Sequence, residues 1–220
     1  MRKTVLILVI SLFVGSYLFA QEKSRGVFLG GRVGVGLVGN MSKLNSDLRL
    51  INPEFKAMNN ITSDFSLTAG YYFLEKYSIR YDLCFGSIFP VTMDKQFSEM
   101  DNTSIGLSGG YSFLRLNRSD FEISLGLRFD GAKFLHSWED ILGNTNLLAL
   151  NTMNIIMPIG LNWWFYPNNS PGYGSKAIGL SISYNYMVKQ GDAYYRGLIN
   201  KAPYSGFAGN SFVIGLAFRL

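Results

Sequence analysis

The sequence predicts an all-β fold, an eight-stranded antiparallel up-and-down transmembrane β-barrel. Three observations support this prediction. Eight segments alternate apolar residues with polar or small ones, the connections between them alternate between short and long, and the apolar face of the segments carries no charge. Each segment has about ten residues, which is enough for a tilted strand to cross a bilayer.

The alternation has the period of two that places successive side chains on opposite faces of a strand. In residues 77–86, aromatic and aliphatic side chains alternate with Ser, Arg, Asp, Cys and Gly. The eight expected strands are residues 26–38, 64–73, 77–86, 103–113, 121–130, 153–165, 178–187 and 211–220. Pro158 lies in the sixth of them, and because proline cannot donate to a strand ladder we expect a bulge or bend near it.

The seven connections sort by length in regular alternation. Three short ones are residues 74–76, 114–120 and 166–177, and four long ones are residues 39–63, 87–102, 131–152 and 188–210. An up-and-down barrel places its short turns on one side of the membrane and its long loops on the other. The alternation therefore supports one barrel domain over residues 21–220.

The two faces of the expected strands differ in a way that identifies the outer one. None of the 44 positions on the apolar face carries a charge, and about half of the positions on the opposite face are Gly or Ser. A soluble barrel would turn a charged face to water, whereas small residues suit the narrow interior of eight tightly curled strands. We therefore expect the apolar face to contact lipid.

The first twenty residues predict a cleaved export signal. Arg2 and Lys3 precede an apolar run from Thr4 to Phe19, and Ala20 is small enough to stand before a cleavage site. The alternative is an uncleaved N-terminal anchor, although about 16 apolar residues is short for a spanning helix.

Composition excludes other classes of protein. Without Arg2 and Lys3 the chain keeps 18 basic and 15 acidic residues, and a net charge of +3 gives no reason to expect a nucleic-acid partner. Cys84 is the only cysteine, so an internal disulfide is excluded. One histidine and one cysteine predict no metal site, and no motif predicts a cofactor.

Eight charged residues fall on the expected inner face, four of each sign. They are Arg32, Asp64, Arg80, Asp82, Glu122, Arg128, Asp130 and Arg219. An unpaired charge in a narrow barrel is costly, so the balance predicts an ion-pair network that plugs the interior. The alternative is a polar relay or an ion path.

The long connections contain more apolar residues than solvated loops need. They are Leu44, Leu48, Leu50, Ile51, Phe55 and Met58 in the first, Trp138, Ile141, Leu142, Leu147, Leu148 and Leu150 in the third, and Tyr194, Tyr195, Tyr204 and Phe207 in the fourth. Two interpretations stay open: these residues pack on one another as a cap, or they form a contact surface or a mouth for an apolar ligand.

One histidine raises the question of catalysis. His136 lies in the third long connection, followed by Ser137, Glu139 and Asp140, a combination found in nucleophilic catalysis. His136 and Ser137 are adjacent, however, and the connection offers no obvious rigid mount. We interpret His136 as a solvated loop residue and expect no catalytic residues.

Two segments resemble a known superfamily. In the last expected strand, Gly215, Leu216, Phe218 and Leu220 resemble the C-terminal assembly signal of outer-membrane barrels, although that signal usually ends in Phe. The segment from Met157 to Phe165 resembles a proline-containing strand of the small outer-membrane β-barrels, a superfamily that includes OmpA-like, OmpX-like and OmpW-like barrel domains. The resemblance implies a bacterial outer membrane as the location, with outer-membrane lipids and the barrel-assembly machinery as partners.

Three functions follow from this resemblance and from the loops. The first is a non-enzymatic structural barrel with a largely plugged lumen, which presents its loops to an extracellular ligand. The second is an OmpW-like transporter or binder of small hydrophobic molecules. The third is a lipid-modifying enzyme centred on His136.

Overall fold

The computed structural model describes residues 26–73, 76–93, 95–140, 142–167, 175–191, 194–195 and 209–220. The expected export signal, residues 1–20, lies outside the described residues. Eight long strands are β1 (Val27–Val38), β2 (Ile61–Phe73), β3 (Tyr77–Met93), β4 (Gln96–Leu116), β5 (Ser119–Glu139), β6 (Thr145–Phe165), β7 (Ala177–Lys189) and β9 (Ser211–Arg219). A two-residue strand, β8 (Tyr194–Tyr195), and one helix, α2 (Met41–Ile51), complete the described elements.

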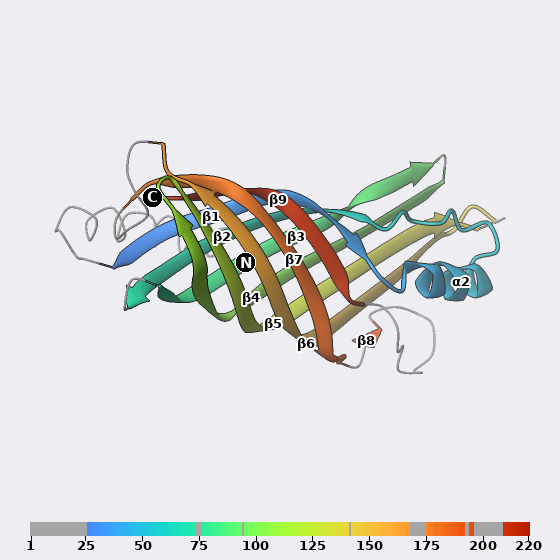
Figure 1. Ribbon diagram of the computed structural model, residues 1–220. Coiled ribbons are helices and arrows are strands. Elements are labelled where there is room, and N and C mark those ends of the chain that lie inside the picture. The colour runs from blue at the N-terminus through green and yellow to red at the C-terminus, as the bar shows by residue number, and fades with distance from the viewer. Residues whose placement is uncertain are drawn as a thin grey trace.

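The eight long strands close into a ring (Figure 1). From β1 to β7 each strand pairs antiparallel with the next along the chain, and β9 pairs with both β7 and β1. Among the described residues, the short β8 pairs with Leu150 and Asn151 of β6 and is not part of the ring. The predicted eight-stranded antiparallel up-and-down barrel is confirmed.

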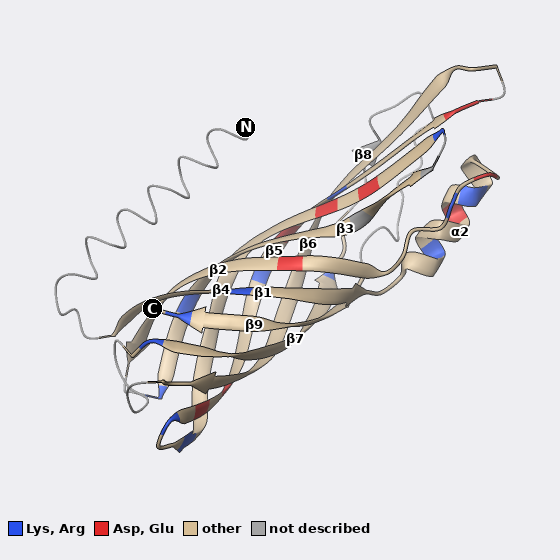
Figure 2. Ribbon diagram, turned by 90° about the horizontal axis from the view of Figure 1, so that it is seen from above, with Lys and Arg blue, Asp and Glu red and all other residues tan. Residues whose placement is uncertain are grey.

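Exposure follows the alternation of the sequence. Val33, Leu107 and Leu125 on the outer face are 57%, 56% and 55% exposed, and Ser66 and Ser104 on the inner face are buried. Most of the wall carries no charge, and the charged residues of the strands are isolated bands on it (Figure 2). The apolar face is therefore the outer one, as expected.

Small residues permit the close approach of β1 and β9. Gly34 faces Gly215 across this pair, and a Cβ on Gly34 would lie only 2.8 Å from the Gly215 Cα atom. Gly31 is an outward position without a side chain, and the ring of Phe218 on β9 occupies the space beside it. Of the residues that resemble the assembly signal, Gly215 thus lies at a tight strand contact, Phe218 covers Gly31, and Leu220 is exposed.

Four strands are longer than expected. The strands β3 and β4 continue through residues 87–93 and 96–102, and β5 and β6 continue through residues 131–139 and 145–152. The prediction that residues 87–102 and 131–152 are long loops was therefore wrong over most of their length, where they form strands. The alternation of inward and outward side chains continues beyond Asp130. The expected strands are shorter because their length was set to the number of residues that crosses a bilayer.

The first long connection contains α2, which the sequence analysis did not predict. Met41, Leu44 and Leu48 form its buried stripe, with the helical spacing of three and four residues. The helix lies at the end of the barrel where the extended strands project (Figure 1), which we call the long-loop end. No helix among the described residues is long and apolar enough to cross a membrane.

The irregularity expected near Pro158 is present. The register between β6 and β7 shifts between Ile155 and Ile156, close to the proline. On its other side, the ladder with β5 omits Met157 and Pro158 and resumes in the same register. The bulge in β6 therefore changes its register with β7. On the side of β5, two residues of β6 lose their pairing but the register is kept.

We predict that Leu125→Arg, on the outer face, destabilises the barrel in lipid by about 2–4 kcal/mol, because lipid cannot solvate the charge. The control is Leu147→Arg, also outward-facing and 51% exposed, but in the projecting part of β6. Its free energy of unfolding in lipid vesicles should change little. Equal losses at the two positions would contradict the assignment of the lipid-covered band.

Candidate functional site

The inner face of the barrel forms the candidate site. Seven of its eight predicted charged residues make ion pairs among the described residues. The shortest N–O distances are 2.8 Å for Arg32–Asp64, 2.5 Å for Arg80–Glu122, 3.2 Å for Arg219–Glu122 and 3.5 Å for Arg128–Asp82. Seven of the eight are buried, and Asp64 is partly buried. The alternation of the strands brings these residues together, because it turns each of them inward.

Glu122 is the centre of this network. Its carboxylate is fully buried and accepts hydrogen bonds from the guanidinium groups of Arg80 and Arg219 and, at 3.1 Å, from the amide of Asn162. The Tyr72 hydroxyl lies 3.5 Å away. One carboxylate therefore holds two arginines from strands on different sides of the lumen, β3 and β9.

Aromatic rings pack around Arg219 inside the barrel near the short turns, at what we call the short-turn end. The guanidinium carbon of Arg219 lies 4.8 Å from the ring centre of Phe28, 4.9 Å from that of Tyr72 and 4.0 Å from that of Trp164. Such contacts between a cation and aromatic faces are attractive, and more so away from water. The three rings and Arg219 thus form a packed constriction, which we call the aromatic constriction.

Asp130 differs from the other acids of the lumen. It makes no ion pair among the described residues, and its oxygens accept hydrogen bonds from Asn102 at 3.3 Å and Asn154 at 3.4 Å. Asp82, by contrast, accepts hydrogen bonds from Thr68 and Ser108 in addition to its ion pair with Arg128. The four positive and four negative residues of the lumen therefore do not form four separate ion pairs.

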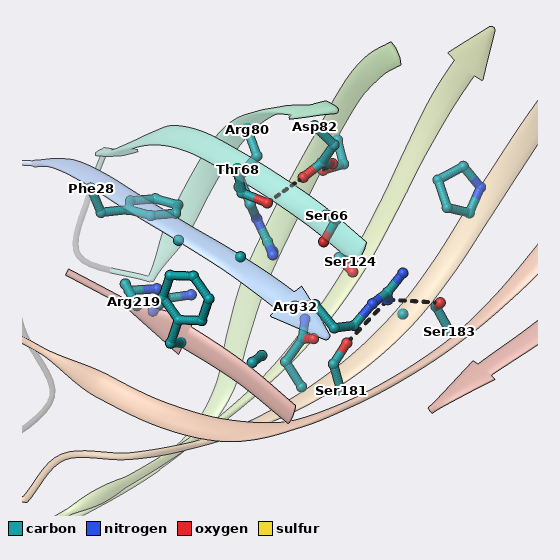
Figure 3. Close-up of a pocket in the computed structure, with 18 of the residues that line it drawn as sticks. Phe28, Arg32, Ser66, Thr68, Arg80, Asp82, Ser124, Ser181, Ser183 and Arg219 are labelled. Carbon is teal, nitrogen blue, oxygen red and sulfur yellow. Dashed lines mark hydrogen bonds between the residues drawn. The ribbon is translucent and has the colours of Figure 1, made fainter. Parts of the chain in front are cut away.

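Two cavities of about 60 Å³ each lie within the barrel. The inner cavity is lined by Arg32, Arg80, Asp82, Arg128 and Arg219, together with serine and threonine hydroxyls (Figure 3). The outer cavity is lined by Asp64, Cys84, Asp130 and again Arg128, with several small and apolar residues. Arg128 thus borders both cavities.

We predict that Glu122→Gln costs more stability than Asp130→Asn. The first change leaves Arg80 and Arg219 buried without a carboxylate, and breaking a buried ion pair in this way costs about 3–5 kcal/mol. The second change removes a charge that has only amide partners, so its cost should be smaller. Urea unfolding of both variants in detergent measures the difference, and a larger loss for Asp130→Asn would overturn this ranking.

Apolar residues of the long-loop end pack on one another in a cluster that we call the cap. Its buried members are Met41, Leu44, Leu48, Phe55, Met58, Ile88, Met100, Ala132, Phe134, Leu148 and Leu150. They come from α2, from the segment after it and from the inner faces of β3 to β6. Of the two interpretations of the apolar loop residues, packing into a cap is therefore confirmed for those from the first and third connections that lie in this cluster.

Some apolar residues of the connections do not join the cap. Leu50, Leu142 and Leu147 are 85%, 81% and 51% exposed. Ile141, Tyr204 and Phe207 lie outside the described residues, as do the side chains of Tyr194 and Tyr195. Leu147 and Leu148 are neighbours, yet the alternation of β6 turns one out and the other in.

The prediction that His136 is a solvated loop residue was wrong. It lies on β5, fully buried, with its ring stacked on Trp138 at 4.9 Å between centres. Its Nδ1 atom is 2.9 Å from the Ser98 hydroxyl, and its Nε2 atom is 3.3 Å from the amide nitrogen of Asn52. Ser137, the neighbour considered for catalysis, belongs to the opposite face of the strand.

The hydrogen bonds around His136 favour one tautomer of its ring. The Asn52 Oδ1 atom accepts a hydrogen bond from the Glu54 N–H group, so the amide nitrogen faces the ring and donates to Nε2. The proton of the neutral ring is then on Nδ1, which faces Ser98 and the Phe97 carbonyl. A ring in this state cannot take the proton of Ser98 through Nδ1, so the pair is not arranged as nucleophile and base.

We predict that acid weakens the cap. Burial lowers the pKa of His136 below its ordinary value, although the hydrogen bond with the Phe97 carbonyl opposes this. In the unfolded chain, His136 binds a proton near pH 6.5, at about the ordinary histidine value, whereas in the folded chain it does so only at lower pH. The free energy of unfolding is therefore unaffected by His136 above about pH 6.5 and declines as the pH falls below this value.

The free energy of unfolding between pH 5 and 8 tests this, since about this window is where histidine titrates. His136 is the only histidine, and the variant His136→Phe, which keeps a ring between its neighbours, should lack the dependence. A wild-type stability that is flat or rises on acidification would contradict the prediction.

Several polar partners of the site were not predicted from the sequence. Asn52, Ser98, Asn102, Asn154 and Asn162 each contact a charged residue or His136. Four of them are inward positions of strands, and continuing the alternation beyond the expected strand ends would have found Ser98. Asn52 has no such signal, because it follows α2. Among the described residues, no group of three or more His, Cys, Asp or Glu side chains could hold a metal ion.

The fold and the interior together define the class: a closed eight-stranded antiparallel barrel with buried ion pairs in its lumen. The chain resembles small outer-membrane β-barrel proteins of known structure. A major outer membrane protein from Thermus thermophilus matches with a TM-score of 0.53 and 9% identity, over 88% of this chain and 99% of that chain. This likeness supports the fold alone.

Two further structures are similar at lower TM-scores. The attachment invasion locus protein Ail of Yersinia pestis matches at 0.45, with 11% identity over 89% of this chain and 97% of that one. Neisserial surface protein A matches at 0.46, with 12% identity over 88% and 94%. No family model matches the chain, and no curated protein matches it in sequence.

Proposed function

We propose that this protein is a non-enzymatic barrel of the bacterial outer membrane, with a plugged lumen and a structural, surface-presenting role. Export by a cleaved signal and insertion by the barrel-assembly machinery belong to the same proposal. The observation that supports it is that side chains pack inside both ends of the barrel. The aromatic constriction lies at the short-turn end, and the cap lies at the long-loop end.

The location is supported by the outer face. Its exposed side chains are aliphatic and aromatic around the ring, and the strand ladders leave no open edge in that band. A hydrocarbon environment requires both properties, because it can neither solvate charges nor bond to free backbone groups. The short-turn end then faces the periplasm, and the cap and projecting strands face outward.

The surface-presenting role is supported by the projecting strands and α2. The hairpins β3–β4 and β5–β6 extend beyond the lipid-covered band, at the same end as α2 (Figure 2), and Lys43 and Arg49 of α2 are exposed. Cap packing fixes the helix against the sheet, with Asn45 making two hydrogen bonds to the backbone of Met58. An extracellular ligand would therefore meet a rigid surface.

The alternative function is an OmpW-like transporter or binder of small hydrophobic molecules. The apolar core of the cap favours this function, because a small hydrophobic molecule would bind there if the cap opened. A lipid-modifying enzyme is a weaker candidate, because the tautomer of His136 leaves Ser98 without a base.

Two measurements on the purified protein separate these functions. We expect little or no steady conductance in a planar bilayer, because side chains pack inside both ends, and no saturable binding of a fluorescent long-chain fatty acid. The matched variants are Leu148→Ser, which disturbs the buried cap, and Leu147→Ser, whose side chain is exposed. Saturable binding that only Leu148→Ser abolishes would favour the hydrophobic transporter, and a large stable current would contradict both functions.

A further inference from the structure

The charges of the connecting segments differ between the two ends of the barrel. The four long connections contain eight basic and eight acidic residues, whereas the three short ones contain four basic residues and two acidic ones. One of these two acids, Asp120, is fully buried and pairs with Arg115. Basic residues colour the end of the barrel opposite α2 (Figure 2). The short-turn end therefore carries an excess of positive charge.

Two neighbouring residues, Arg118 and Lys176, account for this excess. The other acid of the short connections, Glu75, adjoins Lys76 in the sequence. Arg118 and Lys176 are exposed, and neither makes an ion pair with a described residue. The Tyr166 N–H group donates to the Arg118 carbonyl at 2.9 Å, and the register of β6 with β7 places Lys176 on the other side of that segment. At about 4.8 Å for each strand, the two basic residues are roughly 10 Å apart.

An aromatic row on the outer face lies close to these two residues. The rings of Phe113, Phe121 and Trp163 are neighbours on β4, β5 and β6, with ring centres 6.3 and 6.1 Å apart. Aromatic rings on the outer face of a membrane barrel lie at the level of the lipid headgroups. The row therefore marks the edge of the lipid-covered band at the short-turn end.

The depth of the two basic residues matches the headgroup layer. Arg118 is three residues beyond Phe121 toward the turn, and Lys176 is two residues beyond the exposed Ile178. Three residues of a tilted strand span roughly 8 Å of depth. The headgroup layer is roughly 5–8 Å thick on each side of a bilayer, so both side chains reach lipid phosphates.

We propose that Arg118 and Lys176 form a binding surface for the phosphate of an anionic phospholipid such as phosphatidylglycerol, in the leaflet at the short-turn end. This inference rests on the proposed location in an outer membrane. The guanidinium and ammonium groups donate to the phosphate oxygens, and the acyl chains lie on the apolar outer face beside the aromatic row. The balanced charges of the long connections give the other end no such preference.

The fluorescence of Trp163 tests the proposal, because its side chain is 42% exposed in the aromatic row. The purified barrel is placed in vesicles of phosphatidylcholine with a minor share of phosphatidylglycerol, and the acyl chains of one lipid at a time carry bromine, which quenches tryptophan. For equal amounts of brominated lipid, quenching should be about fivefold stronger from phosphatidylglycerol, the factor that one basic residue contributes near an anionic surface. The variant Trp163→Phe gives the background of the other tryptophans.

The two ways in which this experiment fails are distinct. If neither brominated lipid quenches Trp163, the outer face is not covered by lipid, and both the proposed location and this inference are wrong. If the two lipids quench Trp163 equally, the location stands and the preference for an anionic lipid is wrong.

Paired variants assign the preference to the two residues. Replacing both Arg118→Gln and Lys176→Gln should make the two lipids equal in quenching. The matched control, Lys133→Gln with Lys189→Gln, removes two exposed basic residues from the long-loop end and should keep the preference. A preference that survives the first pair of changes, or that the control pair abolishes, would contradict the assignment.

Native mass spectrometry gives a measurement that is independent of fluorescence. The wild type, released from vesicles that contain both lipids, should retain more phosphatidylglycerol than the variant that lacks Arg118 and Lys176. The control variant should retain as much as the wild type. Equal retention of phosphatidylglycerol by all three proteins would overturn the proposal.

Discussion

Closure of eight strands is the constraint on which the rest of this structure depends. A ring of this size has room for side chains but not for a water-filled channel, and it leaves no backbone edge to pair elsewhere. Each strand must therefore turn inward residues that fit the limited space, which are either small residues or larger ones that pack on or pair with one another. The contact of Gly34 with Gly215 and the sharing of Glu122 by two arginines are two results of that same lack of space.

The interior achieves neutrality as a whole rather than pair by pair. Glu122 has two cations, while Asp130 has amide partners and no ion pair among the described residues. Two cavities of unlike character follow from this, with Arg128 between them. The buried charges contribute little net stability once desolvation is counted, but a strand out of register would leave several of them unpaired. Their main physical effect is to favour one register of the strands.

Most of the fold could be predicted from the sequence, because an apolar outer face and a narrow lumen impose an alternation that is easy to read. The inward position of all eight charged residues follows from it. Their partners do not, because which arginine reaches Glu122 depends on register and on the curvature of the ring. The helix α2 and the extended strands were missed for another reason: beyond the bilayer the outer face meets water, and the contrast between faces weakens. His136 illustrates this, since it follows the alternation at a position where the strand had been assumed to end.

The pairing of β1 with β9 joins two strands that are far apart in the sequence, and closure of the barrel depends on it. Gly31 and Phe218 meet at this seam, although almost the whole described chain lies between them. Every other long strand meets a partner that is near in sequence, so hairpins can form locally, but the ring cannot close until β9 arrives. Contacts between distant residues form slowly, because the intervening chain must be ordered first. Until that moment two open edges and the charged lumen are exposed together, and the last step of folding removes both at once.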